Sequence, residues 1–347
     1  MLGVLLVNLG TPQAPHASAV RSYLREFLYD PEVIDVHPVA RWFLLEAVIL
    51  PFRPAKSAEA YQKIWTEAGS PLLIESRSLE VKLRESLGSE AIVELAMRYG
   101  EPSIRASIAR LLAQGASRIF IAPLYPQYSA AATGSTLKAS FAALNHLPVV
   151  PSVSTLPAFY DDPAFLDAFA ERGRKLIADE RADHVLFSFH GLPERQIRKA
   201  DSSGRHCLAS SGCCDSIGPA NRDCYRAQSF ATARGIAQRL GLAEDGYTIC
   251  FQSRLGRTPW IAPHTDVVIP ELAAAGKKRL AVFCPAFVAD CLETLEEISL
   301  RARDQFLGCG GESLTLVPSL NADDAWVSAL AGLVRKHAGA TGYSRSV

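Results

Sequence analysis

The sequence lacks an excess of charge of either sign. Its 347 residues include 36 Lys and Arg and 36 Asp and Glu, so the formal net charge is zero. A general nucleic-acid-binding protein needs a basic surface that displaces counterions. We therefore expect no nucleic-acid partner.

Long hydrophobic runs are also missing. The N-terminus, MLGVLLVNLGTP, has no positively charged start, and its apolar part is too short for a signal peptide. The most apolar stretch, Trp42–Phe52, contains Glu46 and Pro51 and is too short to span a bilayer. We expect a cytoplasmic protein.

Cysteine is scarce, because only eight residues are Cys, far fewer than in a disulfide scaffold. A chain of this length buries a large core without disulfides, and its length predicts about two domains. Several common motifs are absent too: no GxGxxG follows a strand, and there is no P-loop, HExxH or GxSxG. Nucleotide chemistry and serine hydrolysis are therefore poor first hypotheses.

What the sequence does contain is an alternation of short apolar runs with segments of helical period. This alternation predicts an α/β fold with parallel sheets that helices cover on both faces. The Pro- and Ser-rich segment 149–157 is the best crossover between two halves. The predicted strands are Gly3–Val7, Ala91–Met97, Arg118–Ala122, His184–Phe189, Tyr247–Gln252, Arg279–Cys284 and Leu314–Pro318. The predicted helices are Ala17–Tyr29, Leu72–Leu87, Ser103–Gln114, Asp162–Ile177, Ala220–Leu240, Cys291–Leu307 and Asn321–His337.

Ligands of open parallel sheets bind beyond the carboxyl ends of the strands. Here those ends lead into a histidine, an arginine, carboxylates and several aromatic residues, which suits a flat, largely apolar ligand with a few polar groups. Each aromatic residue taken alone could equally belong to the core. The candidates at these ends are Arg98, Tyr125, His190, Trp260, Phe287, Asp290 and Glu293.

His190 ends an apolar strand and precedes Gly191, so we expect the following turn to expose it. It could accept a proton or ligate a metal, or simply hydrogen-bond at the strand end. Asp290 and Glu293 could form a capping box. However, Glu296 and Glu297 would share a helical face with Glu293, and a bound cation or protons in transit would offset their repulsion.

Four cysteines lie in one polar loop, at positions 207, 213, 214 and 224. The spacing lacks the CxxC of zinc ribbons, and adjacent cysteines suit one tetrahedral zinc poorly. A [2Fe–2S] cluster, in which two irons share four thiolates, fits better. Structural zinc and free thiols are the alternatives, and disulfides are disfavoured in the cytosol. We expect Cys207, Cys213, Cys214 and Cys224 to hold the cluster.

Taken together, the motifs resemble those of the ferrochelatases, which insert ferrous iron into a porphyrin in haem synthesis. The similarity covers nearly the whole chain. Its carriers are LLVNLGTP, YQKIWTEAGSPL (61–72), MRYGEPSI (97–104), YPQYSAAATGST (125–136), FSFHGLPER (187–195), FQSRLGRTPWIAPHTD (251–266) and PAFVADCLETLEE (285–297).

The resemblance implies two Rossmann-like domains with a cleft between them and no dinucleotide. Residues 1–150 with about 321–347 would form the first domain, and residues 151–320, which carry the cysteine loop, the second. His190 and Glu293 would be the catalytic pair that contacts the iron, and Asp290 and Glu297 would extend it into a path for metal or protons. The implied porphyrin-binding residues are Leu9, Tyr61, Ser70, Arg98, Tyr125, Trp260 and Phe287.

The chain departs from the family pattern at two positions. Cys291 stands where many relatives carry a second His, and Ala130 stands where animal members place an internal cluster cysteine. The four-cysteine loop instead resembles the internal cluster site of some bacterial members. The apolar segment 42–52 would form a lip over the ligand, or would contact the inner face of the membrane peripherally.

The expected reaction is insertion of Fe²⁺ into protoporphyrin IX to give protohaem. The alternatives are coproporphyrin III as the porphyrin or another metal as the ion. An iron–sulfur redox sensor and a two-domain solute-binding protein are hypotheses from other classes. A sensor would not need His190 and the acidic helix.

Overall fold

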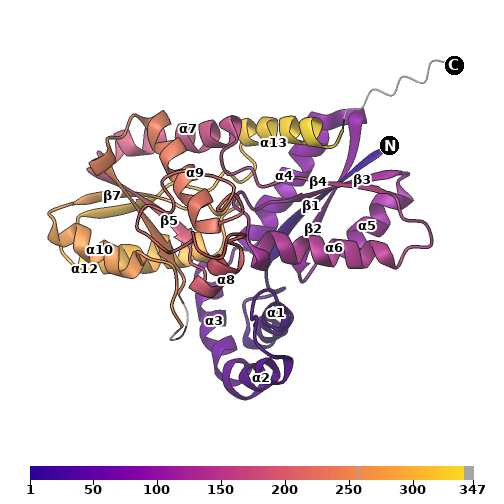
Figure 1. Ribbon diagram of the computed structural model, residues 1–347, viewed down its shortest axis with the longest axis horizontal. Helices are drawn as coiled ribbons and strands as arrows, with labels where there is room; N and C mark the ends of the chain where they lie inside the picture. The colour runs from indigo at the N-terminus through magenta and orange to yellow at the C-terminus, as the bar shows by residue number, and fades with distance from the viewer. Residues whose placement is uncertain (255, 257, 340–347) are drawn as a thin grey trace.

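The computed structural model describes residues 1–254, 256 and 258–339. Two four-stranded parallel sheets lie side by side, with helices on both faces of each (Figure 1). The strand orders are β2-β1-β3-β4 and β6-β5-β7-β8. The predicted fold class is thus confirmed. The strands are β1 Leu2–Gly10, β2 Ala91–Tyr99, β3 Arg118–Pro123, β4 Ser152–Thr155, β5 His184–His190, β6 Tyr247–Gln252, β7 Arg279–Phe283 and β8 Ser313–Leu316.

Helical segments connect the strands. The α-helices are α1 Ala17–Tyr29, α2 Pro38–Phe43, α3 Leu50–Ile64, α4 Pro71–Leu87, α5 Ile104–Ala113, α6 Ser135–Asn145, α7 Pro163–Asp179, α8 Glu194–Lys199, α9 Tyr225–Leu240, α10 Thr265–Ala274, α11 Leu292–Thr294, α12 Arg303–Gly308 and α13 Asp324–His337. The π-helical segments are η1 Leu44–Ile49, η3 Ala130–Gly134 and η5 Leu295–Ala302, and short 3₁₀ turns are η2 Gly88–Glu90 and η4 Glu244–Gly246.

The central strand β1 shows why the sheets need helices on both faces. Its side chains alternate between the faces. Val4 and Leu6 join a core with α4, α7 and α13, whereas Leu5 and Val7 join a separate core with α5 and α6. The strand therefore reads as a continuous apolar run, as strands of buried parallel sheets do. Figure 1 shows α7 and α13 along one side of both sheets.

Three sequence predictions need correction. The segment 149–157 contains a strand, β4, that pairs with β3, so the crossover follows this strand. Helix α9 begins at Tyr225 rather than Ala220, because Asn221 closes a turn by bonding Gly218 N, Cys213 O and Ser216 O. The predicted helix Cys291–Leu307 consists of α11, η5 and α12, with a π-helical centre.

The segment Trp42–Phe52 lies in the helices α2, η1 and α3, which project from the sheets together with α1 (Figure 1). Several of its large apolar side chains are exposed, among them Trp42 at 57% and Phe52 at 76%. None of the helices in the described part of the chain has both the length and the hydrophobicity needed to cross a membrane.

Candidate functional site

The carboxyl ends of β5 and β6 place His190 beside Gln252. These two residues are register partners in the parallel ladder, and Gly191 N donates to the Gln252 carbonyl at 2.8 Å. The Gln252 side chain then reaches α11, where its Nε2 donates to the Glu293 carbonyl at 2.8 Å. The predicted catalytic residues His190 and Glu293 therefore lie at one sheet edge and are linked through Gln252.

The His190 imidazole is half-buried, with Nδ1 only 2.6 Å from the Gly191 carbonyl oxygen. Because a carbonyl can only accept, Nδ1 carries the proton and Nε2 is the basic nitrogen. The ring meets Phe287 edge-on, with centroids 6.3 Å apart. An imidazole held in this tautomer can take a proton or bind a metal ion through Nε2.

Trp260 lies beside the His190 turn. The residues on either side of Trp260 pair with this turn. Glu194 N donates to the Pro259 carbonyl, and Ile261 N donates to the Leu192 carbonyl. A Cβ on Gly191 would come within 3.2 Å of the Trp260 ring and 2.8 Å of the Gln252 carbonyl oxygen. Only glycine allows this close approach.

Glu293 faces buried phenols from the other half of the molecule. Burial is the main cause that raises the pKa of both Tyr23 and Tyr61, and the negative charge of Glu293 adds to each shift. The same charge opposes the effect of burial on Arg53, whose pKa is lowered overall. Burial, followed by Glu293, also raises the pKa of the Cys291 thiol. Glu293 thus lies among neutral hydroxyl and thiol donors near one guanidinium.

The start of α11 is capped differently from the sequence expectation. Cys291 and Thr294 form the capping box, one residue beyond Asp290 and Glu293. Asp290 instead accepts hydrogen bonds from the side chains of Thr294 and Asn321 at 3.0 and 2.8 Å, and from Ser319 N at 3.2 Å. Cys291 therefore has a structural role here as the N-cap of α11, and its thiol also contacts Glu293.

The other two acidic residues of this segment have separate partners. Glu297 accepts from both the backbone and the hydroxyl of Ser253, and from Gln252 Nε2 at 3.4 Å. Glu296 is buried between Lys63 at 3.3 Å and Arg301 at 3.2 Å. Lys63, Arg301 and the hydrogen-bond donors therefore reduce the repulsion expected between these carboxylates. No bound metal ion is needed to reduce this repulsion.

In the first half, Tyr61 hydrogen-bonds with Thr11 and Tyr23. Thr11 in turn pairs with the buried Ser70 hydroxyl at 2.8 Å. Leu9 is half-buried against the same apolar cluster as Tyr61. The structure thus brings Leu9, Tyr61 and Ser70 together, on the side of the site that Glu293 faces.

Arg98 belongs to a polar network around Asp30, a residue that sequence reasoning missed. The Arg98 guanidinium binds Asp30 and Ser135, each at 2.6 Å, and Tyr99 OH donates to Asp30 at 2.8 Å. Burial alone would raise the pKa of Asp30, but hydrogen bonds from the Ser135 hydroxyl, Glu32 N and Tyr99 OH, together with the charge of Arg98, outweigh it and lower the pKa. No sequence motif marked Asp30, because it simply follows the end of α1.

Tyr125 lies near this network. Its phenol is 3.4 Å from the Thr136 hydroxyl, and burial is the main cause that raises its pKa. Gln252 and Tyr23 are two further residues that sequence reasoning did not assign to the site. Gln252 had a usable signal, since it ends a predicted strand inside one of the family motifs.

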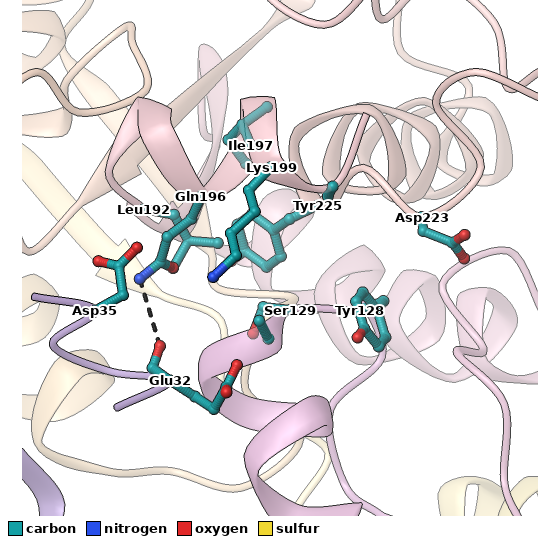
Figure 2. A pocket seen from close by; sticks show the side chains of 12 residues that line it. Glu32, Asp35, Tyr128, Ser129, Leu192, Gln196, Ile197, Lys199, Asp223 and Tyr225 are labelled. Atoms are coloured by element: carbon teal, nitrogen blue, oxygen red, sulfur yellow. Dashed lines mark hydrogen bonds between the residues drawn. The ribbon is translucent and has the colours of Figure 1, made fainter. Parts of the chain in front are cut away.

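A cavity of about 200 Å³ touches both halves, and Figure 2 shows its lining. None of the predicted porphyrin-binding residues lines it, and it is smaller than a pocket for a drug-sized ligand. It is therefore distinct from the predicted porphyrin site. Its lining residues are Glu32, Asp35, Tyr128, Ser129, Ala130, Leu192, Gln196, Ile197, Lys199, Ala200, Asp223 and Tyr225.

The four loop cysteines are all buried, and their contacts run in series from Cys207 through Cys224 and Cys214 to Cys213. Cys224 hydrogen-bonds with both Cys207 and Cys214, and the Sγ atoms of Cys213 and Cys214 are 3.7 Å apart. Arg226 donates to Cys214 Sγ at 3.1 Å. Nevertheless, across residues 1–254, 256 and 258–339, no three His, Cys, Asp or Glu side chains are grouped so as to hold a metal ion.

Asp201 organises the start of this loop. One carboxylate oxygen accepts from the Ser203 and Gly204 amides, and the other accepts from the amides of His206 and Cys207, at 2.7 to 3.2 Å. The Ser203 hydroxyl and these amides hold the pKa of Asp201 below its ordinary range. Sequence reasoning missed Asp201, although an Asp-Ser-Ser-Gly run is typical of such turns.

The two four-stranded parallel sheets flanked by helices form a chelatase-type fold. Two solved structures share the fold. A sirohydrochlorin chelatase SirB from Bacillus subtilis subspecies spizizenii, in complex with cobalt, matches with a TM-score of 0.52, 12% identity and coverage of 96% of this chain and 94% of that chain. SirB from Bacillus subtilis with Fe³⁺ also gives 0.52, with 14% identity and coverage of 77% and 91%.

The family itself follows from sequence relatives. The family model described as Ferrochelatase matches residues 1–338. Proteins named ferrochelatase from Ectopseudomonas mendocina (strain ymp) and Legionella pneumophila (strain Paris) are 48% and 46% identical to this chain. The first match covers 94% of this chain and 95% of the relative, and the second covers 96% and 98%. The chain belongs to the ferrochelatase family.

Proposed function

We propose that the protein inserts Fe²⁺ into protoporphyrin IX, giving protohaem and releasing two protons. Membership of the ferrochelatase family makes it a metal–porphyrin chelatase. The observation that carries the site assignment is the position of His190 and Glu293 at one sheet edge, joined through Gln252. Iron and porphyrin are the substrates.

The reaction requires a bent ring, because two pyrrole protons block the cavity formed by four nitrogens. Binding energy from the periphery of the ring can support this distortion. We assign the aromatic side chains Tyr61, Tyr125, Trp260 and Phe287, with Leu9, to holding the ring. Arg98 would meet the porphyrin at its edge, and Ser70 would lie near a propionate.

His190 and Glu293 would then divide two tasks, removal of the pyrrole protons and contact with the iron. The protonated Nδ1 of His190 is fixed by the Gly191 carbonyl, so Nε2 is the atom that accepts a proton or binds metal. Glu293 would supply the second acceptor, among the phenols of Tyr61 and Tyr23.

The acidic path would continue from Glu293 to Glu297, which Ser253 and Gln252 hold in place. Asp290 would add negative charge to this path. Both of its carboxylate oxygens accept hydrogen bonds, so its position is fixed by Thr294, Ser319 and Asn321.

The finer assignment of the cysteine loop is a [2Fe–2S] cluster held by Cys207, Cys213, Cys214 and Cys224. A cluster of two irons takes two thiolates on each iron, and the four buried thiols adjoin one another in one continuous group. Burial raises the pKa of Cys207 and Cys213, so assembly would release protons from neutral thiols. Because metal insertion is redox-neutral, the cluster would serve a structural or sensing role.

The projecting segment Trp42–Phe52 supports peripheral contact with the inner face of the membrane, and thus a cytoplasmic enzyme near its apolar substrate. Exposed Trp42, Phe43 and Phe52 supply apolar area, and Lys56 on α3 supplies positive charge. The domain division also stays a proposal: residues 1–150 with about 321–347, and residues 151–320. Of these, residues 340–347 lie outside the described part of the chain.

The test is anaerobic turnover with ferrous iron and protoporphyrin IX, followed by loss of porphyrin fluorescence and gain of haem absorbance. His190→Ala and Glu293→Gln should each lower kcat by at least about 100-fold while porphyrin binding changes little. Near-normal turnover of either variant would remove that residue from the catalytic pair. Faster turnover with coproporphyrin III or with cobalt would reassign the substrate, and an iron–sulfur spectrum without any turnover would favour the redox sensor.

A further inference from the structure

Gln252 connects the ends of strands β5, β6 and β7 to the acidic segment formed by α11 and η5. It ends β6, and its side chain is only 3% exposed. Its Oε1 accepts from Ser188 Oγ on β5 at 2.8 Å and from the Cys284 thiol, directly after β7, at 3.8 Å. Its Nε2 donates to the Glu293 carbonyl at 2.8 Å and to Glu297 Oε2 at 3.4 Å.

These partners determine the orientation of the amide. Hydroxyl and thiol donors lie on the oxygen side, and a carbonyl and a carboxylate, which only accept, lie on the nitrogen side. Thr265 Oγ1 bonds Ser188 at 2.9 Å and Cys250 Sγ at 3.1 Å, so the hydroxyl that contacts Gln252 is itself held. A flipped amide would set its oxygen against the Glu293 carbonyl and the Glu297 carboxylate and lose both of these bonds.

We propose that Gln252 is a positioning residue that sets the distance between His190 and the carboxylates of Glu293 and Glu297. Its backbone is the register partner of His190 and its side chain holds Glu293 and Glu297, so one residue fixes both sides of the reaction. The inference rests on the proposed catalytic roles of His190 and Glu293.

The principal variant is Gln252→Met, which keeps the length and approximate volume of the side chain and removes both the donor and the acceptor. We expect kcat to fall about 10- to 100-fold, the usual effect of removing a group that orients catalytic ligands. The KM for porphyrin should stay within about twofold, because Gln252 is assigned no contact with the ring. The matched control is Gln228→Met, which removes an equally buried glutamine on α9 that binds Tyr128 N and Arg222 O.

A double-mutant cycle with Glu297→Gln separates positioning from general loss of structure. If Gln252 acts through Glu297, the double variant should lose less activity than the product of the two single losses. Losses that multiply, a Gln252→Met activity within about twofold of the parent, or an equal loss in Gln228→Met would each overturn the proposal.

Ser188→Ala provides a second route if Gln252→Met fails to fold. It removes only the hydroxyl that donates to Oε1, and we expect a kcat loss in the same direction, about two- to tenfold. An unchanged kcat in this variant would contradict the proposal. His190→Ala serves as the reference: if it stays active, the proposed catalytic role of His190 fails, whereas an inactive His190→Ala beside a normal Gln252→Met refutes only the role of Gln252.

Discussion

Gly191 shows how a residue without a side chain shapes the site. A Cβ there would lie 2.8 Å from the Gln252 carbonyl oxygen and 3.2 Å from the Trp260 ring. Gly191→Ala should therefore displace the loop that carries Trp260, raise the KM for porphyrin and lower the free energy of unfolding by about 1–3 kcal/mol. Steady-state kinetics and chemical denaturation measure both effects.

The control for this prediction is Gly246→Ala, since a Cβ there would meet only Leu242 at an ordinary 3.9 Å. If Gly191→Ala behaves like Gly246→Ala, the packing of Trp260 against this turn is not needed for the site.

Asp30 makes a prediction about pH. Its folded-state pKa is lowered, so its contribution to stability is complete above its unfolded pKa of about 3.9 and is lost as pH falls through the folded value. Asp30→Asn removes a buried partner of Arg98 and should reduce the free energy of unfolding by about 3 kcal/mol at pH 7. The difference in free energy of unfolding between variant and parent should become smaller below about pH 4. A difference that stays constant down to pH 2 would show that the Asp30 charge contributes nothing to stability.

From the sequence, several candidate site residues could be placed at the ends of predicted strands, and their roles stay predictions. His190, Trp260 and Phe287 follow strands, and the structure brings their loops together at one sheet edge. Gln252, Asp30 and Asp201 were missed because their importance lies in what they accept or donate across distant segments. A local sequence pattern does not indicate burial or hydrogen-bond partners of this kind.

At the scale of elements, hydrophobic periodicity located the segment Cys291–Leu307 but predicted one continuous helix. The wider π-helical turns of η5 lie at its centre, and the cap forms at Cys291 and Thr294 rather than at Asp290. Periodicity cannot separate π from α geometry over eight residues, and the choice between adjacent capping residues depends on tertiary partners. The strand β4 was missed for a related reason: its Pro and Ser content resembles a linker.

The cysteine loop carries a prediction through Asp201. Asn retains one acceptor oxygen but would place its NH2 group against backbone N–H donors, so Asp201→Asn should loosen the loop. If the loop holds the proposed cluster, the iron content and visible absorbance per chain should fall as well. Limited proteolysis within residues 202–223 should become faster. Asp215→Asn, at an exposed aspartate of the same loop, is the control. Equal protease resistance in both variants would contradict an organising role for Asp201.

At the scale of the whole molecule, the projecting helices α2 and α3 carry a prediction about membranes. Replacing Trp42, Phe43 and Phe52 with Ser should weaken binding to vesicles of anionic phospholipid at least about tenfold, because apolar area is lost from the surface. A flotation assay measures this, and Val149→Ser, at a residue 80% exposed elsewhere, should bind like the parent. Undiminished binding of the triple variant would place membrane contact on another surface.

The two-sheet architecture followed from the sequence because apolar runs and helical periods are local. The way in which α13 connects the two halves did not follow from the sequence. This helix packs on both α4 and α7. Its side chains Trp326, Leu330 and Val334 share a core with Leu79 and Leu83. Contacts between segments this far apart leave no periodic signal.

The position of α13 has a consequence for synthesis on the ribosome. Helix α4 emerges early, but the helix that covers it is the last described element to be made, tens of seconds later at ordinary translation rates. Throughout that time Leu79 and Leu83 lack part of their final cover. A nascent chain that stalls before α13 would therefore leave this apolar face open to chaperones and proteases until the helix is made.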